Sequence, residues 1–96
     1  NFPQHIANLK MIFGMMRKNG LITDDNWTKS ISAKIDAVES TISKKSKNFS
    51  TTAINQINAT LNEVSAQNGK HLTPRGAYFL SKELGSLLAR IENGSY

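Results

Sequence analysis

The sequence predicts an all-α fold, an up-down antiparallel four-helix bundle in which residues 1–96 form a single domain. Apolar residues recur at helical spacing in four segments, and no segment shows the sustained polar/apolar alternation of a strand. The connections between the segments are short, which makes consecutive helices antiparallel neighbours around a shared core. A chain of 96 residues has room for one such domain.

The first two helices are expected at each side of a connection near residue 20. The first ends before Gly20, after Arg17 and Lys18, whose positive charges suit the C-terminal end of a helix dipole. The second begins after Thr23 or Asp24, either of which can cap a helix N-terminus. Their apolar stripes are Ile6, Leu9, Ile12, Phe13 and Met16 in the first helix, and Trp27, Ile31, Ile35, Val38 and Ile42 in the second.

The third and fourth helices meet at a second connection, near residue 70. The third is expected to begin at Ser50 or Thr51 and to end at residues 68–69. The fourth has the clearest start, because Thr73 suits the N-cap and Pro74 suits the first helical position. Their stripes are Ala53, Ile54, Ile57, Leu61 and Val64 in the third helix, and Ala77, Leu80, Leu84, Leu87, Leu88 and Ile91 in the fourth.

The composition argues against several classes of chemistry. The chain has no cysteine, which excludes disulfides, thiolate zinc sites and cysteine nucleophiles. Its two histidines, His5 and His71, are expected to be exposed to solvent. We find neither a glycine-rich phosphate loop nor a nucleophile elbow, and no apolar run long enough to span a membrane. We therefore expect no enzyme, no metal, no cofactor and no membrane span.

Two distinctive runs lie in the second half of the chain. They are AINQINA at residues 53–59 and GKHLTP at residues 69–74, with looser agreement at residues 20–22 and 33–37. Over roughly residues 6 to 91, the chain resembles the FIMAH-type helical module of secreted bacterial proteins. The resemblance implies a non-catalytic domain that accompanies carbohydrate-active or proteolytic enzymes and serves protein interaction or attachment.

Four large apolar residues, Met11, Met15, Tyr78 and Phe79, fall outside the main stripes of the first and fourth helices. On one interpretation, Phe79 packs against the first or third helix at the edge of the bundle. On the other, these side chains form an exposed patch for a protein partner or a sugar, in which methionine adapts to varied shapes. They are our candidate partner-binding residues.

The most concentrated positive charge is the cluster Lys44, Lys45 and Lys47, within a chain of net charge +5. These lysines are expected to close the second helix, where cations favour the dipole. They could also contact phosphate or an acidic partner, although a nucleic-acid interface usually interleaves arginine with aromatic residues, and that pattern is missing here.

These observations favour a non-catalytic protein-interaction or attachment module of a secreted or cell-surface bacterial protein, which could be appended to an enzyme. The abundance of asparagine, serine and threonine (10, 10 and 7 residues) agrees with that location. Because residue 1 is asparagine, we expect a processed form or an excised domain. The alternatives are a small free-standing inhibitor or immunity-type protein, and a weak binder of nucleic acid or acidic partners through Lys44, Lys45 and Lys47.

Overall fold

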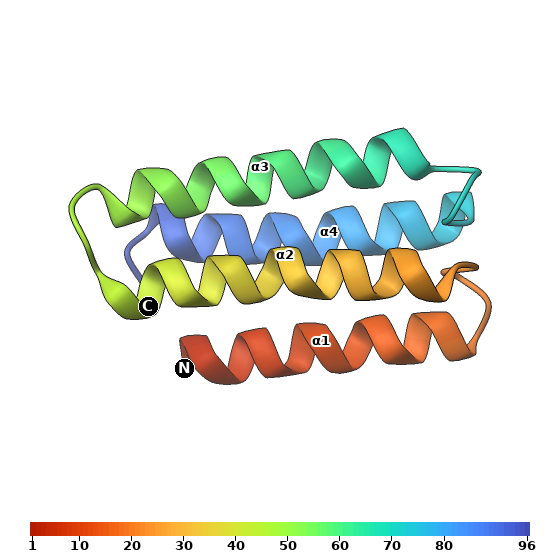
Figure 1. Cartoon of the computed structure of the whole chain (residues 1–96), viewed down its shortest axis with the longest axis horizontal. Helices are drawn as coiled ribbons and strands as arrows, with labels where there is room; N and C mark the ends of the chain where they lie inside the picture. Colours follow the sequence, from red (N-terminus) through yellow and green to blue (C-terminus); the bar gives the residue numbers. More distant parts are fainter.

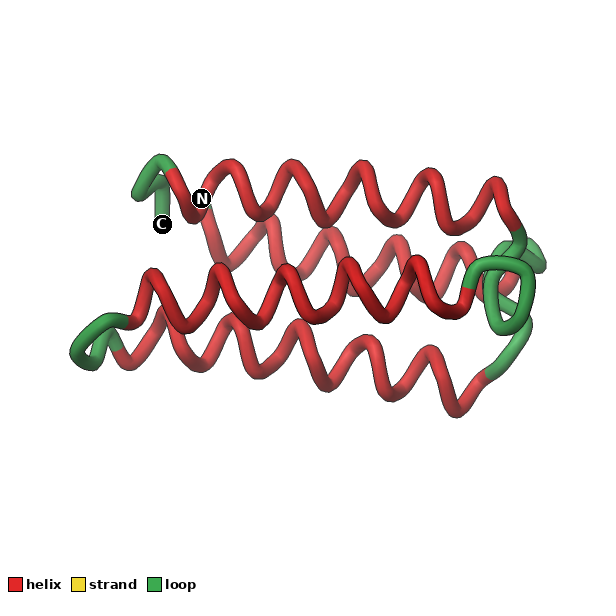
Figure 2. Tube along the Cα trace, turned by 90° about the horizontal axis from the view of Figure 1, so that it is seen from above, coloured by secondary structure: helices red, strands yellow, loops and turns green.

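The computed structural model describes residues 1–96 as four helices without a β-strand, which confirms the predicted fold class (Figure 1). The helices are α1 (Phe2–Lys18), α2 (Asp25–Lys44), α3 (Phe49–Gln67) and α4 (Pro74–Glu92). Seen from above, all four run along one long axis (Figure 2), and the bundle measures 38 × 22 × 20 Å. Each helix packs beside the next, and α1 closes the ring against α4 with the loosest of the four contacts.

The helix starts show why these segments are helical. The side chain of Asp24 accepts a hydrogen bond from the backbone N–H of Trp27 at 2.9 Å, and Thr73 Oγ1 accepts one from the N–H of Gly76 at 3.0 Å. Both satisfy backbone donors that the first turn of a helix leaves free. The predicted caps of α2 and α4 are therefore confirmed, and α1 begins in the same way at Asn1.

The core is a single cluster of 20 buried apolar residues that comes mainly from the predicted stripes. Four stripe residues at the edges of their helices are only partly buried: Ile12, Ile54, Leu61 and Leu88. In addition, the structure buries three apolar residues that helical periodicity did not assign to the core: Phe2, Ile22 and Leu72. The last two lie in connections, so the core extends beyond the helices at that end of the bundle.

The connection between α2 and α3 corrects two predictions. Helix α2 ends at Lys44, so Lys45 and Lys47 do not belong to it; Lys45 takes a left-handed conformation with φ of 47° that ends the helix. Helix α3 begins at Phe49 rather than at Ser50 or Thr51. Asn48, also left-handed, redirects the chain so that Phe49 packs on the core.

None of the four helices combines the length and the apolar character that a membrane-spanning helix requires.

Candidate functional site

Two connections distant in sequence lie side by side at one end of the bundle, which we call the paired-loop end (residues 19–24 and 68–73). The N–H of Thr23 donates to the carbonyl of His71 at 2.9 Å, and the N–H of Thr73 donates to the carbonyl of Leu21 at 3.0 Å. These bonds bridge Ile22 and Leu72 in antiparallel fashion. The two connections are thereby held together independently of their side chains.

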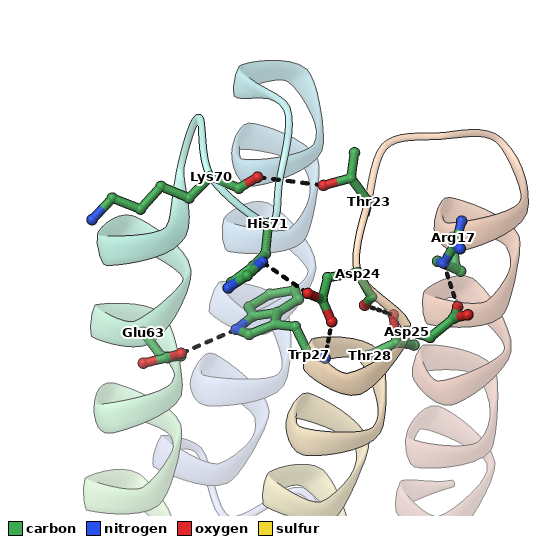
Figure 3. Close-up of polar contacts among 9 residues, drawn as sticks. All are labelled: Arg17, Thr23, Asp24, Asp25, Trp27, Thr28, Glu63, Lys70 and His71. Atoms are coloured by element: carbon green, nitrogen blue, oxygen red, sulfur yellow. Dashed lines mark hydrogen bonds and ion pairs between the residues drawn. The ribbon is translucent and has the colours of Figure 1, made fainter.

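A polar cluster around Trp27 reinforces this end (Figure 3). The indole Nε1–H of Trp27 donates to Glu63 Oε1 at 3.0 Å, which ties α2 to α3. The ring of His71 stacks on the indole with centroids 6.5 Å apart, and its Nδ1 lies 3.3 Å from Asp24 Oδ2. The hydrogen bond from the N–H of Trp27 lowers the pKa of Asp24 below its ordinary value, and His71 acts in the same direction.

Both histidines, which we expected to be exposed, are only partly exposed, because each lies against an aromatic or cationic neighbour. His71 stacks on the indole of Trp27 and keeps 41% of its side chain exposed. At the other end of the bundle, His5 Nδ1 lies 3.3 Å from Arg90 Nη1. Burial lowers the pKa of His5, and the positive charge of Arg90 lowers it further. The sequence placed His5 at the start of α1 but could not identify its neighbour on α4.

The start of α4 rests directly on the connection between α1 and α2. A Cβ atom added to Gly76 would lie 2.6 Å from the carbonyl oxygen of Leu21, closer than real Cβ atoms approach other atoms. The same carbonyl accepts the hydrogen bond from Thr73. Leu21 is therefore fixed in place by backbone contacts from α4.

An open apolar groove of about 190 Å³ lies beside this fixed connection, where α1 and α4 meet. We call it the α1–α4 groove. Five of its six lining residues are hydrophobic. The lining consists of Ile12, Met15, Met16, Asn19, Leu21 and Phe79. The amide of Asn19 donates to the carbonyl of Met15 at 2.9 Å, so the single polar member already has a partner for its donor.

The groove brings together two of the four candidate partner-binding residues, Met15 and Phe79. Met15 is 56% exposed and Phe79 is 40% exposed, so both leave apolar surface at the rim. Met11, 64% exposed, lies one turn before Met15 on α1 and outside the lining. Tyr78, 71% exposed, is also outside the lining, because one residue of rotation turns it about 100° away from Phe79.

The lysine cluster lies at the opposite end of the molecule. Lys44, Lys45 and Lys47 surround the connection between α2 and α3, at the end where both chain termini lie (Figure 1). All three side chains are exposed, and none has a carboxylate within ion-pair distance. The cluster and the α1–α4 groove are therefore separate surfaces.

Sequence reasoning missed four of the groove residues. Ile12 and Met16 belong to the predicted stripe of α1, so their spacing indicated a core role and gave no sign of a groove. Asn19 and Leu21 lie in a connection, where helical periodicity carries no information. Only Leu21 had a usable signal, as a large apolar residue directly after a turn glycine.

The rest of the surface has one further hollow, which is smaller and less apolar than the α1–α4 groove. A second hollow of about 170 Å³ between α2 and α3 is lined by Lys34, Ala37, Gln56, Ala59 and Thr60, of which two are hydrophobic. The buried Oε1 atom of Gln56 has no hydrogen-bond partner there. No three side chains of histidine, aspartate or glutamate gather in a way that could hold a metal ion.

Comparisons with protein-family models, with curated proteins and with solved structures found no match to this chain. The resemblance to the FIMAH-type module stays a prediction.

Proposed function

We propose that this domain is a non-catalytic protein-interaction or attachment module, and that it binds its partner through the α1–α4 groove. The observation that supports the proposal is an open apolar groove with Met15 and Phe79 exposed at its rim. Exposed apolar surface has an unfavourable contact with water that a partner relieves. The groove is also next to the paired-loop end, where backbone hydrogen bonds join two connections.

The size and lining of the groove suit one large apolar side chain. Its volume of about 190 Å³ leaves room for such a side chain, and methionines at the wall can change shape to fit the guest. The opposite wall is better fixed, because Leu21 is held by α4 through its backbone carbonyl. A preformed wall beside an adaptable one lowers the entropy cost of binding while tolerating some variation in the partner.

The proposed setting is a secreted or cell-surface bacterial protein. Its support is the surface rich in asparagine, serine and threonine, and the resemblance to a module that accompanies secreted enzymes. In that setting the domain would hold a companion enzyme near another protein or near the cell envelope.

Capture from culture medium and envelope extract tests the proposal. The wild-type domain is immobilised beside the variants Met15→Ser and Phe79→Ser, with Tyr78→Ser as the matched control outside the groove. Circular dichroism establishes that each variant keeps its helices. We expect a captured protein that both groove variants lose and the control retains. Equal capture by the groove variants and the wild type would contradict the proposal.

A further inference from the structure

We propose that the α1–α4 groove accepts an acidic amphipathic segment of a partner protein. The segment inserts one apolar side chain between Met15 and Phe79 and places its carboxylates beside Lys18, Arg75 and Lys82. This inference rests on the proposed function and adds the chemistry of the partner.

These three cations have no acidic partner within the domain. Lys18, Arg75 and Lys82 are exposed and take part in none of the ion pairs of the structure. Two other cations on α1 form ion pairs with carboxylates on α2. Lys10 Nζ lies 2.6 Å from Asp36 Oδ1, and Arg17 pairs with Asp25. The charges on the α2 side of α1 are therefore neutralised locally, whereas those near the groove are not.

The same three cations lie close in sequence to Met15 and Phe79 at the rim of the groove. Lys18 follows Met15 by three residues, and Lys82 follows Phe79 by three, while Arg75 precedes Phe79 by four. Residues at these spacings are neighbours on a helix surface. Because α1 and α4 are antiparallel, Lys18 and Arg75 both lie toward the paired-loop end, and Lys82 lies farther along α4. Cations thus border the groove on both helices.

The two carboxylates nearest these cations, Asp25 and Glu83, do not form ion pairs with them. Asp25 is paired with Arg17. Glu83 forms no ion pair; it is partly buried and close enough to His5 to raise the pKa of that histidine, so its charge acts on the α1 side of α4. A partner with acidic groups around an apolar anchor would therefore find complementary charge at the rim, and a basic partner would be repelled.

A phage library of random linear peptides tests the inference. Peptides are selected on the wild-type domain and counter-selected on the double variant Met15→Ser/Phe79→Ser, which keeps every charge. We expect the retained peptides to combine a large apolar residue with an excess of aspartate and glutamate. Their affinity is expected to fall as salt is raised, because exposed charges are screened.

Charge variants then separate the groove from the rest of the surface. Lys18→Gln/Arg75→Gln/Lys82→Gln is expected to weaken the selected peptides about tenfold, the combined effect of three exposed ion pairs. The matched control Lys44→Gln/Lys45→Gln/Lys47→Gln removes the same charge at the other end and is expected to leave affinity unchanged. All six side chains are exposed, so both variants should fold.

The outcomes distinguish this inference from the proposed function. Groove-dependent peptides without an acidic excess, or peptides that bind both triple variants equally, overturn the inference and leave the groove as an interaction site. A selection that yields no groove-dependent peptide also overturns the inference. The proposed function itself fails only if capture from medium and envelope extract does not depend on Met15 and Phe79.

Discussion

The two ends of this bundle solve the same problem, turning the chain between antiparallel helices, in different ways. At the paired-loop end, Gly20 and Gly69 supply the positive φ values, and two connections exchange backbone hydrogen bonds. At the other end, which we call the terminal end (residues 45–48 and both termini), Lys45 and Asn48 adopt left-handed conformations instead. There the aromatic ring of Tyr96 packs on Phe2 and Phe49, with centroids 6.5 and 5.2 Å apart.

The difference indicates where the domain can hold a shaped surface. Backbone hydrogen bonds between segments about fifty residues apart fix the paired-loop end in one arrangement, and the groove lies beside it. At the terminal end no backbone hydrogen bond joins the separate segments, and aromatic packing among Phe2, Phe49 and Tyr96 brings them together instead. We therefore expect changes at the paired-loop end to cost more stability than comparable changes at the terminal end.

The largest effect is expected from truncating a core residue at the paired-loop end. Leu72 is buried to 1% exposure, so Leu72→Ala removes burial and leaves a cavity at a cost of about 3 kcal/mol. Phe49→Ala, at a partly buried position of the terminal end, is expected to cost about 1.5 kcal/mol. Urea unfolding followed by circular dichroism measures both. A larger loss for Phe49→Ala would reverse the ranking of the two ends.

The next largest effect concerns the close contact of α4 with the first connection. In Gly76→Ala, the new methyl group meets the carbonyl of Leu21, and the strain outweighs the gain in helix propensity by about 2 kcal/mol. Gly85→Ala is the matched control on the same helix, since nothing lies within 4 Å of its added Cβ. It is expected to raise the free energy of unfolding by up to about 1 kcal/mol. Thermal and urea unfolding of both variants give the comparison, and a neutral Gly76→Ala would disprove the contact.

A smaller effect, of opposite sign, is expected at the terminal end. Lys45 is a non-glycine residue at φ of 47°, a conformation that Cβ disfavours. Lys45→Gly removes that strain and is expected to stabilise the domain by about 0.5 to 1 kcal/mol. Lys47→Gly, which lies in the same connection without a positive φ, serves as the control and should not stabilise. Urea unfolding midpoints at a fixed pH decide between them.

The smallest effects are expected from pH, in a different range at each end. His5 has a folded pKa below its ordinary value of 6.5, because burial and Arg90 disfavour its charged form. Its contribution to stability is complete above pH 6.5 and is lost as the pH falls through the folded pKa. The pKa of Asp24 lies below its ordinary value of 3.8, because the N–H of Trp27 and the neighbouring His71 favour its ionised form. Its contribution to stability is therefore complete above pH 3.8 and is lost as the pH falls through the folded pKa.

Unfolding midpoints measured across these ranges test the assignment to each end. His5→Gln should flatten the dependence just below pH 6.5, and Asp24→Asn should flatten only the dependence below pH 3.8 while retaining a side chain that can cap α2. If the two variants changed the same pH range, the separation of the two ends would be wrong.

Much of the fold could be predicted because the signals that form and end a helix lie close together in the sequence. The stripe of α2 is buried as its spacing indicates, that of α4 is buried except for the partly buried Leu88, and the caps at Asp24 and Thr73 lie where their side chains suggest. The predicted start of α3 was wrong by one or two residues. The helix begins at Phe49, after the left-handed Asn48, because Phe49 packs on the core. No capping pattern in the sequence reveals that contact. Of the candidate site residues, Met15 and Phe79 line the α1–α4 groove, whereas Met11 and Tyr78 lie outside its lining and the lysines lie at the other end.

The sequence by itself determined four amphipathic helices and the direction in which each buries its apolar face, since both depend on spacing and end signals within about twenty residues. Only the tertiary structure decided which flank of α1 meets α4. Lys10 and Arg17 lie on the flank toward α2, and Ile12 and Met15 lie on the flank toward α4. A bundle of the opposite handedness would bury the same stripes, but its α2 and α4 would lie on opposite flanks of α1 from those seen here. The groove therefore exists because contacts across the whole chain select one of two arrangements that periodicity leaves equivalent.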